Sequence, residues 1–426
     1  MKKENTSFIL KGNVCYSKSP KEAAFIKDAC IVCSDGICGG VYKTLPEKYK
    51  TLPLIDHRDA LIIPGLTDLH LHAPQYPFRA LGMDLELLEW LNTNTFPEEA
   101  KYIDLEYAGK AYTMFVEDIK KGATTRACVF ATIHAEATKL LMELLDKSGI
   151  CAYVGKVNMD RNSPEYLCEA SAADSAQDTA SWIEDTLHGY ERIKPIITPR
   201  FVPTCSNELL ERLGTLAKNY HLPVQSHLSE NPGEVAWVKE LVPDAAFYGE
   251  VYDRYGLFGK EVPAIMAHCV YSDEKETERM LQNGVYIAHC PQSNTNIASG
   301  IAPIRRYLDM GMHIGLGTDV VDGYSTSILR AMADTIQVSK LRWRLCDHTL
   351  KPVSLEEAFY MGTKGGGSFF GKVGSFEEGY RFDAVVVEDS DLVTPRLLTL
   401  RDRLERVVYM SENCKIKAKY VDGVQL

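Results

Sequence analysis

Residues 61–76 read Leu61-Ile62-Ile63-Pro64-Gly65-Leu66-Thr67-Asp68-Leu69-His70-Leu71-His72-Ala73-Pro74-Gln75-Tyr76, an apolar run that ends in a polar cluster. His70 and His72 are two residues apart, and in a β-strand such residues point to the same face. Both imidazoles can therefore reach one metal ion. A bare His-x-His pair also fits two ordinary surface or core histidines. Its position at the end of an apolar strand favours a site, because α/β folds place their sites at the carboxyl ends of parallel strands.

The overall composition is that of a globular enzyme-sized chain. The 426 residues are 45% hydrophobic and 25% charged, which leaves room for a large barrel and a smaller domain. The net charge of −11 argues against general affinity for nucleic acid. No stretch approaches the ~18 consecutive apolar residues of a membrane helix, and no long apolar segment follows Met1 as in a signal peptide. We therefore expect a cytoplasmic protein.

The twelve cysteines are spread along the chain, as expected of buried thiols in a reducing compartment. Cys30-x-x-Cys33, with Cys38 nearby, could suggest structural zinc. Such a site needs four ligands, and there is no second Cys-x-x-Cys pair to complete it. We expect free cysteines in a small hairpin around Ser34-Asp35-Gly36.

Strand and helix patterns alternate after the His-x-His strand. Further strands are predicted at 124–130, 150–157, 195–201, 222–227, 264–268, 285–289 and 313–319, and helices at 104–121, 137–145, 181–190 and 209–220. Ser272 is predicted to cap a helix that runs to Leu281. Eight strands joined by helices predict an α/β fold, a (β/α)8 TIM-like barrel.

Both ends of the chain have β character. Short strands with turn signals fill the first 60 residues, and strands are predicted again at 381–388 and 406–410. We expect the barrel to span 64–372, and 1–63 with 373–426 to form a small β-sandwich domain. The segment 92–97 is predicted to be an irregular connection of the kind that often forms a lid or a binding loop.

Polar residues gather at the predicted strand ends, which meet at one mouth in a barrel. They are His70, His72, Arg200, Phe201, His227, Glu230, His268, His289 and Asp319. Three imidazoles and one carboxylate suit Zn²⁺ or Fe²⁺, whereas Mg²⁺ and Ca²⁺ prefer oxygen ligands. A bound ion of this kind activates water near neutral pH.

Metal-assisted hydrolysis also needs a proton carrier, and Glu230 is the candidate. It lies three residues after His227, so it can face a substrate while His227 faces the metal. The alternative is a solvated loop carboxylate or a helix N-terminal charge.

Pro64-Gly65-Leu66-Thr67-Asp68-Leu69-His70-Leu71-His72, with His227, His268 and Gly317-Thr318-Asp319, resembles the amidohydrolase superfamily over nearly the whole chain. Further motifs are similar to the guanine deaminase family within it. They are His72-Ala73-Pro74-Gln75-Tyr76, Leu88-Glu89-Trp90-Leu91 with Thr95-Phe96-Pro97, Pro199-Arg200-Phe201, His227-Leu228-Ser229-Glu230-Asn231, Ala288-His289-Cys290-Pro291-Gln292-Ser293-Asn294, and Gly315-Leu316-Gly317-Thr318-Asp319-Val320.

The resemblance implies hydrolysis of guanine to xanthine and ammonia by a metal-activated water, in a homodimer. It implies one divalent ion, Zn²⁺ first and Fe²⁺ as the alternative, on His70, His72, His227 and Asp319.

The resemblance also implies catalytic roles. Glu230 protonates ring N3, Asp319 moves the proton of the water, and His268 orients the water. The purine is held by Gln75, Arg200 and Phe201, bordered by His72 and His227. Arg and Gln side chains can donate to the carbonyl and ring-nitrogen acceptors of a purine, and a flat ring stacks on Phe.

Other interpretations remain open. The same chemistry would serve an amino-purine, pterin or triazine deaminase, and a more distant alternative is a non-catalytic scaffold. Binuclear relatives carry a lysine near the end of the fourth strand. Here Arg200 holds that position and Lys194 lies at the other end, which predicts one ion. His134-Ala135-Glu136 matches half of a cytidine-deaminase signature, but the Pro-Cys-x-x-Cys half is absent.

Overall fold

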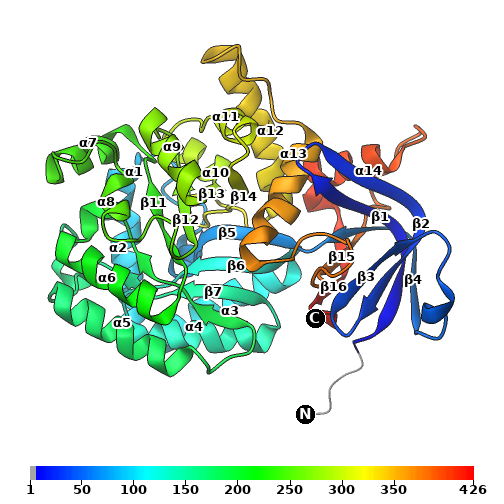
Figure 1. The fold of residues 1–426 in the computed structure, drawn as a ribbon, viewed down its shortest axis with the longest axis horizontal. Coiled ribbons are helices and arrows are strands. Elements are labelled where there is room, and N and C mark those ends of the chain that lie inside the picture. Colours follow the sequence, from blue (N-terminus) through cyan, green and yellow to red (C-terminus); the bar gives the residue numbers. More distant parts are fainter. Residues whose placement is uncertain (1–5) are drawn as a thin grey trace.

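The computed structural model describes residues 6–426, and its larger part is built on one parallel sheet (Figure 1). The sheet has eight strands in the order β11-β12-β13-β14-β5-β6-β7-β9. A parallel bridge joins Ile197, just after β9, to Val224 in β11 at the other end of that order. The strands are β5 Leu66–His72, β6 Thr124–Phe130, β7 Cys151–Gly155, β9 Ile193–Pro195, β11 Val224–Leu228, β12 Ala264–His268, β13 Tyr286–His289 and β14 His313–Leu316, with β8 Val157–Asn158 and β10 Thr198–Pro199 paired beside them.

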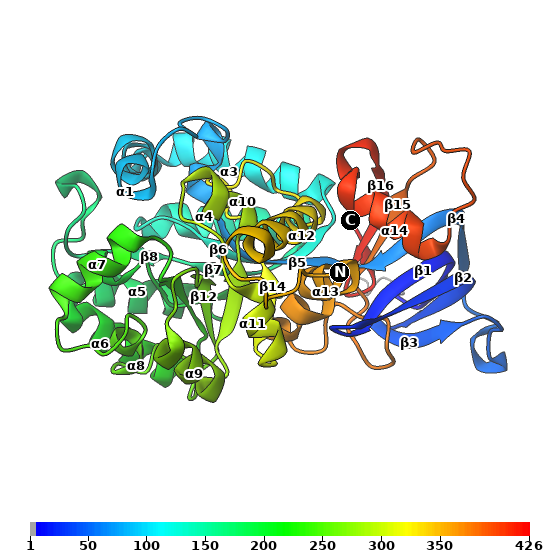
Figure 2. The ribbon, with the colours of Figure 1, turned by 90° about the horizontal axis from the view of Figure 1, so that it is seen from above.

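Helices surround this sheet on the outside (Figures 1 and 2). They are α1 Leu87–Trp90, α2 Phe96–Glu99, α3 Leu105–Lys121, α4 Ala135–Ser148, α5 Ala172–Thr186, α6 Asn207–Tyr220, α7 Pro232–Leu241, α8 Glu250–Asp253, α9 Glu274–Asn283, α10 Pro291–Asn296, α11 Ile304–Asp309, α12 Ile328–Leu345 and α13 Leu355–Tyr360. The apolar stripe predicted on 137–145 is confirmed, because Ala137, Leu141 and Leu145 of α4 are buried.

The two ends of the chain pair in a second sheet, at the right of Figure 1. Its seven strands have the order β17-β16-β15-β4-β1-β2-β3. They are β1 Phe8–Ser19, β2 Glu22–Ser34, β3 Ile37–Tyr42, β4 Leu54–Pro64, β15 Ala384–Glu388, β16 Lys415–Val421 and β17 Val424–Gln425. The sheet has its own apolar core, in which Phe8 and Leu10 from one end of the chain meet Phe382 and Tyr420 from the other.

The segment 92–97 is helical, so the expected irregular connection is wrong. A π-helical turn at Leu91–Thr95 joins α1 to α2. Pro97 stands in the first turn of α2, directly after that turn. Proline is tolerated there, because the widened π-helical turn already departs from the regular hydrogen-bond ladder that proline would interrupt.

The segment 406–410 is also helical, although its run of valines suggested a strand. It belongs to α14, Leu400–Tyr409, in which Thr399 and Asp402 form a reciprocal capping box. Leu404, Val407 and Val408 are buried at helical spacing. The cap and the packing of this face outweigh the β preference of valine.

Two predicted helix boundaries differ from those in the structure. The N-cap of α9 is Asp273 and not Ser272, and its side chain accepts a hydrogen bond from the Glu276 amide. A carboxylate caps a helix as well as a hydroxyl does, so the one-residue shift follows from geometry rather than from residue preference. The helix predicted at 181–190 begins earlier, as α5.

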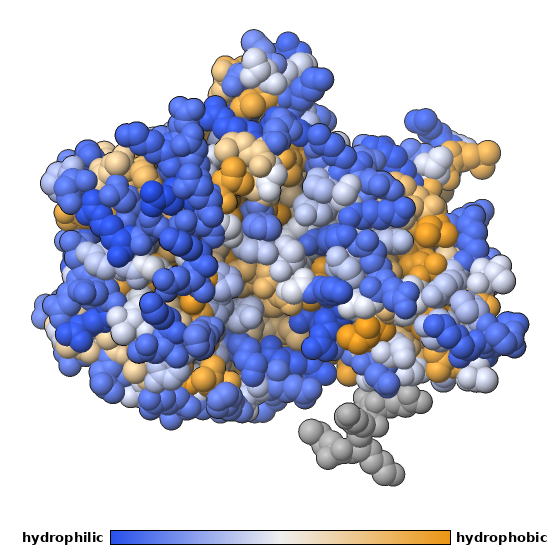
Figure 3. Space-filling model, in the orientation of Figure 1, coloured by the Kyte–Doolittle hydropathy of each residue, from blue (hydrophilic) through white to orange (hydrophobic). Residues whose placement is uncertain are grey.

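All twelve cysteines are free thiols. The hairpin predicted around Ser34-Asp35-Gly36 is formed by β2 and β3, in which Cys33 pairs with Cys38. Among residues 6–426, no helix combines the length and the apolar character that crossing a bilayer requires. Hydrophilic side chains cover most of the face seen in Figure 3, and apolar side chains appear there in small separate groups.

Candidate active site

The carboxyl ends of the parallel strands bring five metal-capable side chains together. His70 and His72 end β5, His227 lies in β11, His268 ends β12 and Asp319 follows β14. None of the five is more than 9% exposed. Residues far apart in the chain therefore share one enclosed space, as the strand pattern predicted.

The imidazoles face one another through their Nε2 atoms. His72 Nε2 lies 3.2 Å from His227 Nε2, and His70 Nε2 lies 3.2 Å from Asp319 Oδ1. The ligand atoms of His70, His72 and His227 all lie within 4.8 Å of one another. Two ring nitrogens cannot face each other this closely in a dry interior without a shared proton or a common ion.

The hydrogen bond of His227 decides which of its nitrogens is free. Its Nδ1 lies 2.6 Å from the carbonyl oxygen of Arg200. A carbonyl only accepts, so Nδ1 carries the proton and Nε2 keeps its lone pair. Burial, and then the charge of His70, lower the pKa of His227 well below its ordinary value. His227 is therefore a neutral imidazole with a lone pair aimed at His72.

The cluster fits a divalent metal ion. His70 Nε2 and both carboxylate oxygens of Asp319 are buried and make no hydrogen bond. Unpartnered buried polar atoms are rare in folded proteins, and here they converge. Nitrogen ligands with one carboxylate oxygen suit Zn²⁺ or Fe²⁺ better than Mg²⁺ or Ca²⁺.

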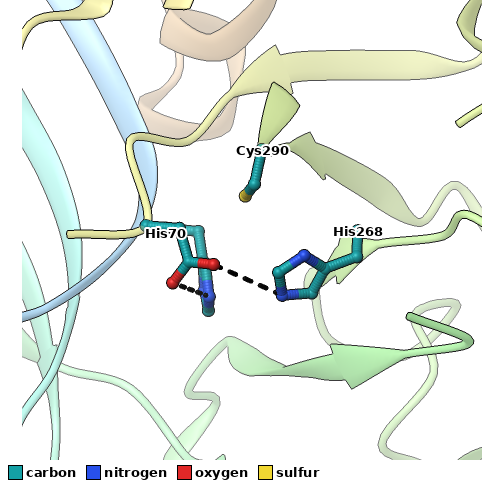
Figure 4. Close-up of side chains that lie close together, drawn as sticks. His70, His268 and Cys290 are labelled. Carbon is teal, nitrogen blue, oxygen red and sulfur yellow. Dashed lines mark ion pairs between the residues drawn. The ribbon is translucent and has the colours of Figure 1, made fainter. Parts of the chain in front are cut away.

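Figure 4 shows His268 and His70 directed at the same carboxylate, with the thiol of Cys290 pointing into the same space. The carboxylate is Asp319, whose Oδ2 lies 3.7 Å from His268 Nε2. His268 Nδ1 is fixed by Asn294 Oδ1 at 2.9 Å. Cys290 is not among the predicted site residues, although its sulfur belongs to a second metal-capable group with His70, His268 and Asp319.

Glu230 lies beside this cluster. Its Oε2 is 3.4 Å from His268 Nε2, and its Oε1 accepts a hydrogen bond from Ser299 at 3.3 Å. Burial, then the charges of Glu234 and Asp319, raise the pKa of Glu230 well above its ordinary value. Glu230 is only 3% exposed, so it is not a solvated loop carboxylate. A buried carboxyl that keeps its proton can act as an acid.

A pocket opens next to Glu230 and reaches the residues that sequence analysis chose for the substrate. It is lined by His72, Gln75, Leu87, Leu91, Arg200, Phe201, His227, Glu230 and Asp322. Phe201 and the two leucines supply apolar walls, and Arg200 supplies a cation. Such a mixed lining suits a small flat ring with polar edges.

Glu99 holds the polar side of this pocket. Its Oε2 accepts from Arg200 Nη1 at 2.7 Å, and its Oε1 accepts from Gln75 Nε2 at 2.9 Å. Gln75 therefore turns its amino group to Glu99, and its unpartnered atom is the carbonyl oxygen. The predicted contact of Gln75 with a purine acceptor needs a donor at this position, whereas the free atom of Gln75 is an acceptor.

Glu99 and Asp322 were both missed. Glu99 comes three residues after Phe96, just beyond the segment 92–97 that is predicted to be irregular. Helical spacing from Thr95-Phe96-Pro97 was the signal that could have found it. Asp322 comes three residues after Asp319 and has no motif of its own.

Three further residues considered in the sequence are His289, His134 and Lys194. His289 is buried beside the cluster, and neither of its ring nitrogens has a hydrogen-bond partner. His134 precedes α4 and does not line the pocket. Lys194 Nζ donates to the carbonyls of Tyr190 and Leu187, so it points to the helix that precedes its strand.

Comparisons with known proteins agree with this geometry. Residues 61–426 match the model of the amidohydrolase family. The chain is 37% identical to a guanine deaminase of Dictyostelium discoideum over 87% of this chain and 83% of that protein. It is 38% identical to the guanine deaminase of Homo sapiens over 85% and 82% of the two chains. A crystal structure of the guanine deaminase from C. acetobutylicum with bound guanine superposes with a TM-score of 0.96, at 49% identity over 99% of this chain and 100% of that one. The chain therefore belongs to the amidohydrolase family, in the group formed by these guanine deaminases.

Proposed function

We propose that this chain hydrolyses guanine to xanthine and ammonia. One observation carries the proposal: a cluster of metal-capable side chains, a buried glutamic acid and a lining of polar and aromatic side chains meet at one pocket. The guanine deaminases at 37–38% identity and the guanine-bound structure at 49% support the choice of ring.

The family depends on metal, and His70, His72, His227 and Asp319 would hold one divalent ion here, Zn²⁺ in the first place and Fe²⁺ as the alternative. Bound there, the ion lowers the pKa of a water molecule enough to make it a nucleophile near neutral pH. Arg200, where binuclear relatives have a bridging lysine, supports a single ion.

The side chains around the ion have separate tasks. Phe201 stacks on the purine, and the guanidinium of Arg200 donates to its carbonyl edge. Glu230 carries its proton to ring N3, so that charge does not build up on the ring as C2 is attacked. Asp319 would take one proton of the attacking water and pass it to the departing ammonia, and the second proton of that water would replace the one that Glu230 gives to N3. His268, held by Asn294, orients that water.

The fold proposal is a (β/α)8 barrel over 64–372 with a small β-sandwich built from 1–63 and 373–426. The parallel bridge between Ile197 and Val224 supports closure of the barrel. The separate apolar core of the seven-stranded sheet supports the second domain. A homodimer in the cytoplasm stays a prediction.

The test is ammonia release by purified protein of measured metal content, with guanine, adenine, a pterin and melamine as parallel substrates. We expect turnover of guanine, about one ion per chain, and loss of activity on chelation that Zn²⁺ or Fe²⁺ restores. A metal-loaded protein that is inactive on guanine but active on another ring would overturn the choice of substrate. A metal-loaded protein that deaminates none of these rings would overturn the proposal itself.

A further inference from the structure

Asp322 places a carboxylate in the pocket with no partner of its own. It lies in the loop after β14 and lines the same space as Gln75, Arg200 and Glu230. It is 6% exposed, and its Oδ1 is buried without a hydrogen-bond partner. Most buried polar atoms in folded proteins are hydrogen-bonded, so an orphan acceptor in a pocket points to a donor on the ligand.

The backbone around Asp322 is fixed. Its carbonyl oxygen accepts from Asn296 Nδ2 at 2.6 Å, and the next amide, of Gly323, donates to the Asp319 carbonyl at 2.7 Å. A Cβ at Gly323 would lie 1.9 Å from the Thr318 carbonyl oxygen. The backbone of this loop is therefore held in position, and Asp322 keeps its place on the pocket wall.

The cation of the pocket is already engaged. Arg200 donates to Glu99 through Nη1, and no hydrogen bond joins Arg200 to Asp322 among the contacts of residues 6–426. Burial, then the charge of Asp319, raise the pKa of Asp322, and the positive charge of Arg200 opposes that rise. A ligand N–H bonded to the carboxylate would oppose it further, because hydrogen bonds to the charged form favour ionisation.

The chemistry of guanine supplies such a donor. Its carbonyl and imine nitrogens accept hydrogen bonds, whereas its N1–H and N9–H donate them. An arginine only donates, so it can bond the acceptor atoms of guanine but not its ring N–H groups. An oxygen of Asp322 accepts whether the carboxyl is ionised or neutral, because a protonated carboxyl keeps an accepting carbonyl oxygen, and so Asp322 matches a ring N–H.

We propose that Asp322 accepts a hydrogen bond from a ring N–H of the purine and thereby contributes to the choice of substrate. This inference rests on the proposed function. If the bonded group is N1–H, Asp322 rejects rings such as adenine, whose N1 carries no hydrogen. If it is N9–H, Asp322 rejects purines substituted at N9.

The experiment compares wild type, Asp322→Ala and Asp322→Asn on guanine, 1-methylguanine and 9-methylguanine. For guanine we expect Asp322→Ala to lower kcat/KM by about 10- to 100-fold, mainly through KM, as for loss of one hydrogen bond to a charged group. Asp322→Asn, which keeps the shape and one acceptor oxygen, should lose less. Tyr324→Phe, an exposed change in the same loop, is the matched control and should leave kcat/KM unchanged.

The two methylated guanines show whether N1–H or N9–H is the group that donates to Asp322. In Asp322→Ala, the preference for guanine over one of the two methylguanines should fall by about 10-fold or more. The variant lacks the carboxylate that bonds the N–H of guanine and that would clash with a methyl group at the same ring position. The preference over the other should not change. Where turnover of an analogue is absent, its Ki against guanine gives the same ratio.

Unchanged kcat/KM for guanine in Asp322→Ala would overturn the inference, and so would unchanged preference against both analogues. Equal loss in kcat with unchanged KM, or loss of bound metal, would show a structural role instead and would also overturn it. These outcomes differ from failure of the proposed function, in which wild type itself would not turn over guanine.

Discussion

Glu230 is the residue on which proton transfer depends. The change Glu230→Gln keeps the shape and the ability to bond Ser299 but removes the acidic proton. We expect a loss in kcat of about 10²- to 10⁴-fold, because general acid catalysis contributes that much. The metal content should stay at the wild-type value, since no proposed ligand is changed.

Turnover of guanine by purified Glu230→Gln, with metal measured on the same sample, checks this. Wild-type kcat would remove Glu230 from the mechanism. Loss of metal in step with activity would mean that Glu230 supports the metal cluster instead of the ring.

Glu99 acts through its neighbours, since it bonds Arg200 and Gln75 and does not line the pocket itself. Glu99→Gln replaces an acceptor-only group by an amide that cannot accept from both. We expect KM for guanine to rise by about 10-fold or more with a smaller change in kcat, because misplaced binding groups weaken ground-state and transition-state binding alike.

Steady-state kinetics on guanine measures the effect, with Glu98→Gln as the matched control. Glu98 is the preceding residue, but its carboxylate bonds Lys101 and Tyr107. If Glu98→Gln raised KM as much as Glu99→Gln, the effect would belong to helix α2 as a whole rather than to the carboxylate of Glu99.

Among the elements, the junction between β4 and β5 sets where the catalytic strand begins. Gly65 separates the two strands, and its amide donates to the Asp383 carbonyl at 3.0 Å. A Cβ at Gly65 would lie 2.2 Å from Thr125 Oγ1, a buried atom of β6. Gly65→Ala should therefore lower the free energy of unfolding by about 1–3 kcal/mol, the usual result of overpacking.

The comparison variant is Gly109→Ala in α3, where the nearest atom to a new Cβ lies 3.7 Å away. There alanine should raise the free energy of unfolding by up to about 1 kcal/mol, through its better helix propensity. Urea denaturation measures the expected decrease in the free energy of unfolding for Gly65→Ala and the expected increase for Gly109→Ala. A Gly65→Ala protein as stable as wild type would show that β5 and β6 can move apart at this point.

At the level of the whole molecule, polar contacts join the two sheets. Arg126 in β6 forms a buried ion pair with Asp383, before β15, and a partly buried one with Asp422, after β16. Lys419 of β16 donates to three carbonyls around the end of α3 and the start of β6. The C-terminal strands of the second sheet are thereby fixed against β6, the neighbour of β5 in the parallel sheet.

Arg126→Met should lower the free energy of unfolding by about 3–5 kcal/mol, because Asp383 would remain buried without its counter-charge. Arg381→Met is the control. It removes a 3.7 Å pair with Asp422 whose arginine is 55% exposed, and exposed pairs contribute only about 0–1 kcal/mol. Equal shifts of the urea midpoint in the two variants would contradict a special role for the buried pair.

Much of the strand pattern could be predicted from local sequence. The strands at 124–130 and 264–268 have the predicted bounds, as β6 and β12, because apolar runs between turn residues are local signals. The segments 92–97 and 406–410 could not be predicted in the same way. Their helical state depends on a π-helical turn, a capping box and packing against neighbours, which override residue preference.

Residue types, their order along the chain and their places at strand ends are local properties of the sequence, and they were enough to predict one site from His70, His72, His227, Glu230 and Asp319. Which atoms of the site are free depends on the folded chain. Glu99 accepts from the Gln75 amino group and leaves the Gln75 carbonyl oxygen without a partner, and Asp322 also keeps an unpartnered oxygen. Hydrogen bonds between residues far apart in sequence fix these orientations, and no local pattern encodes them.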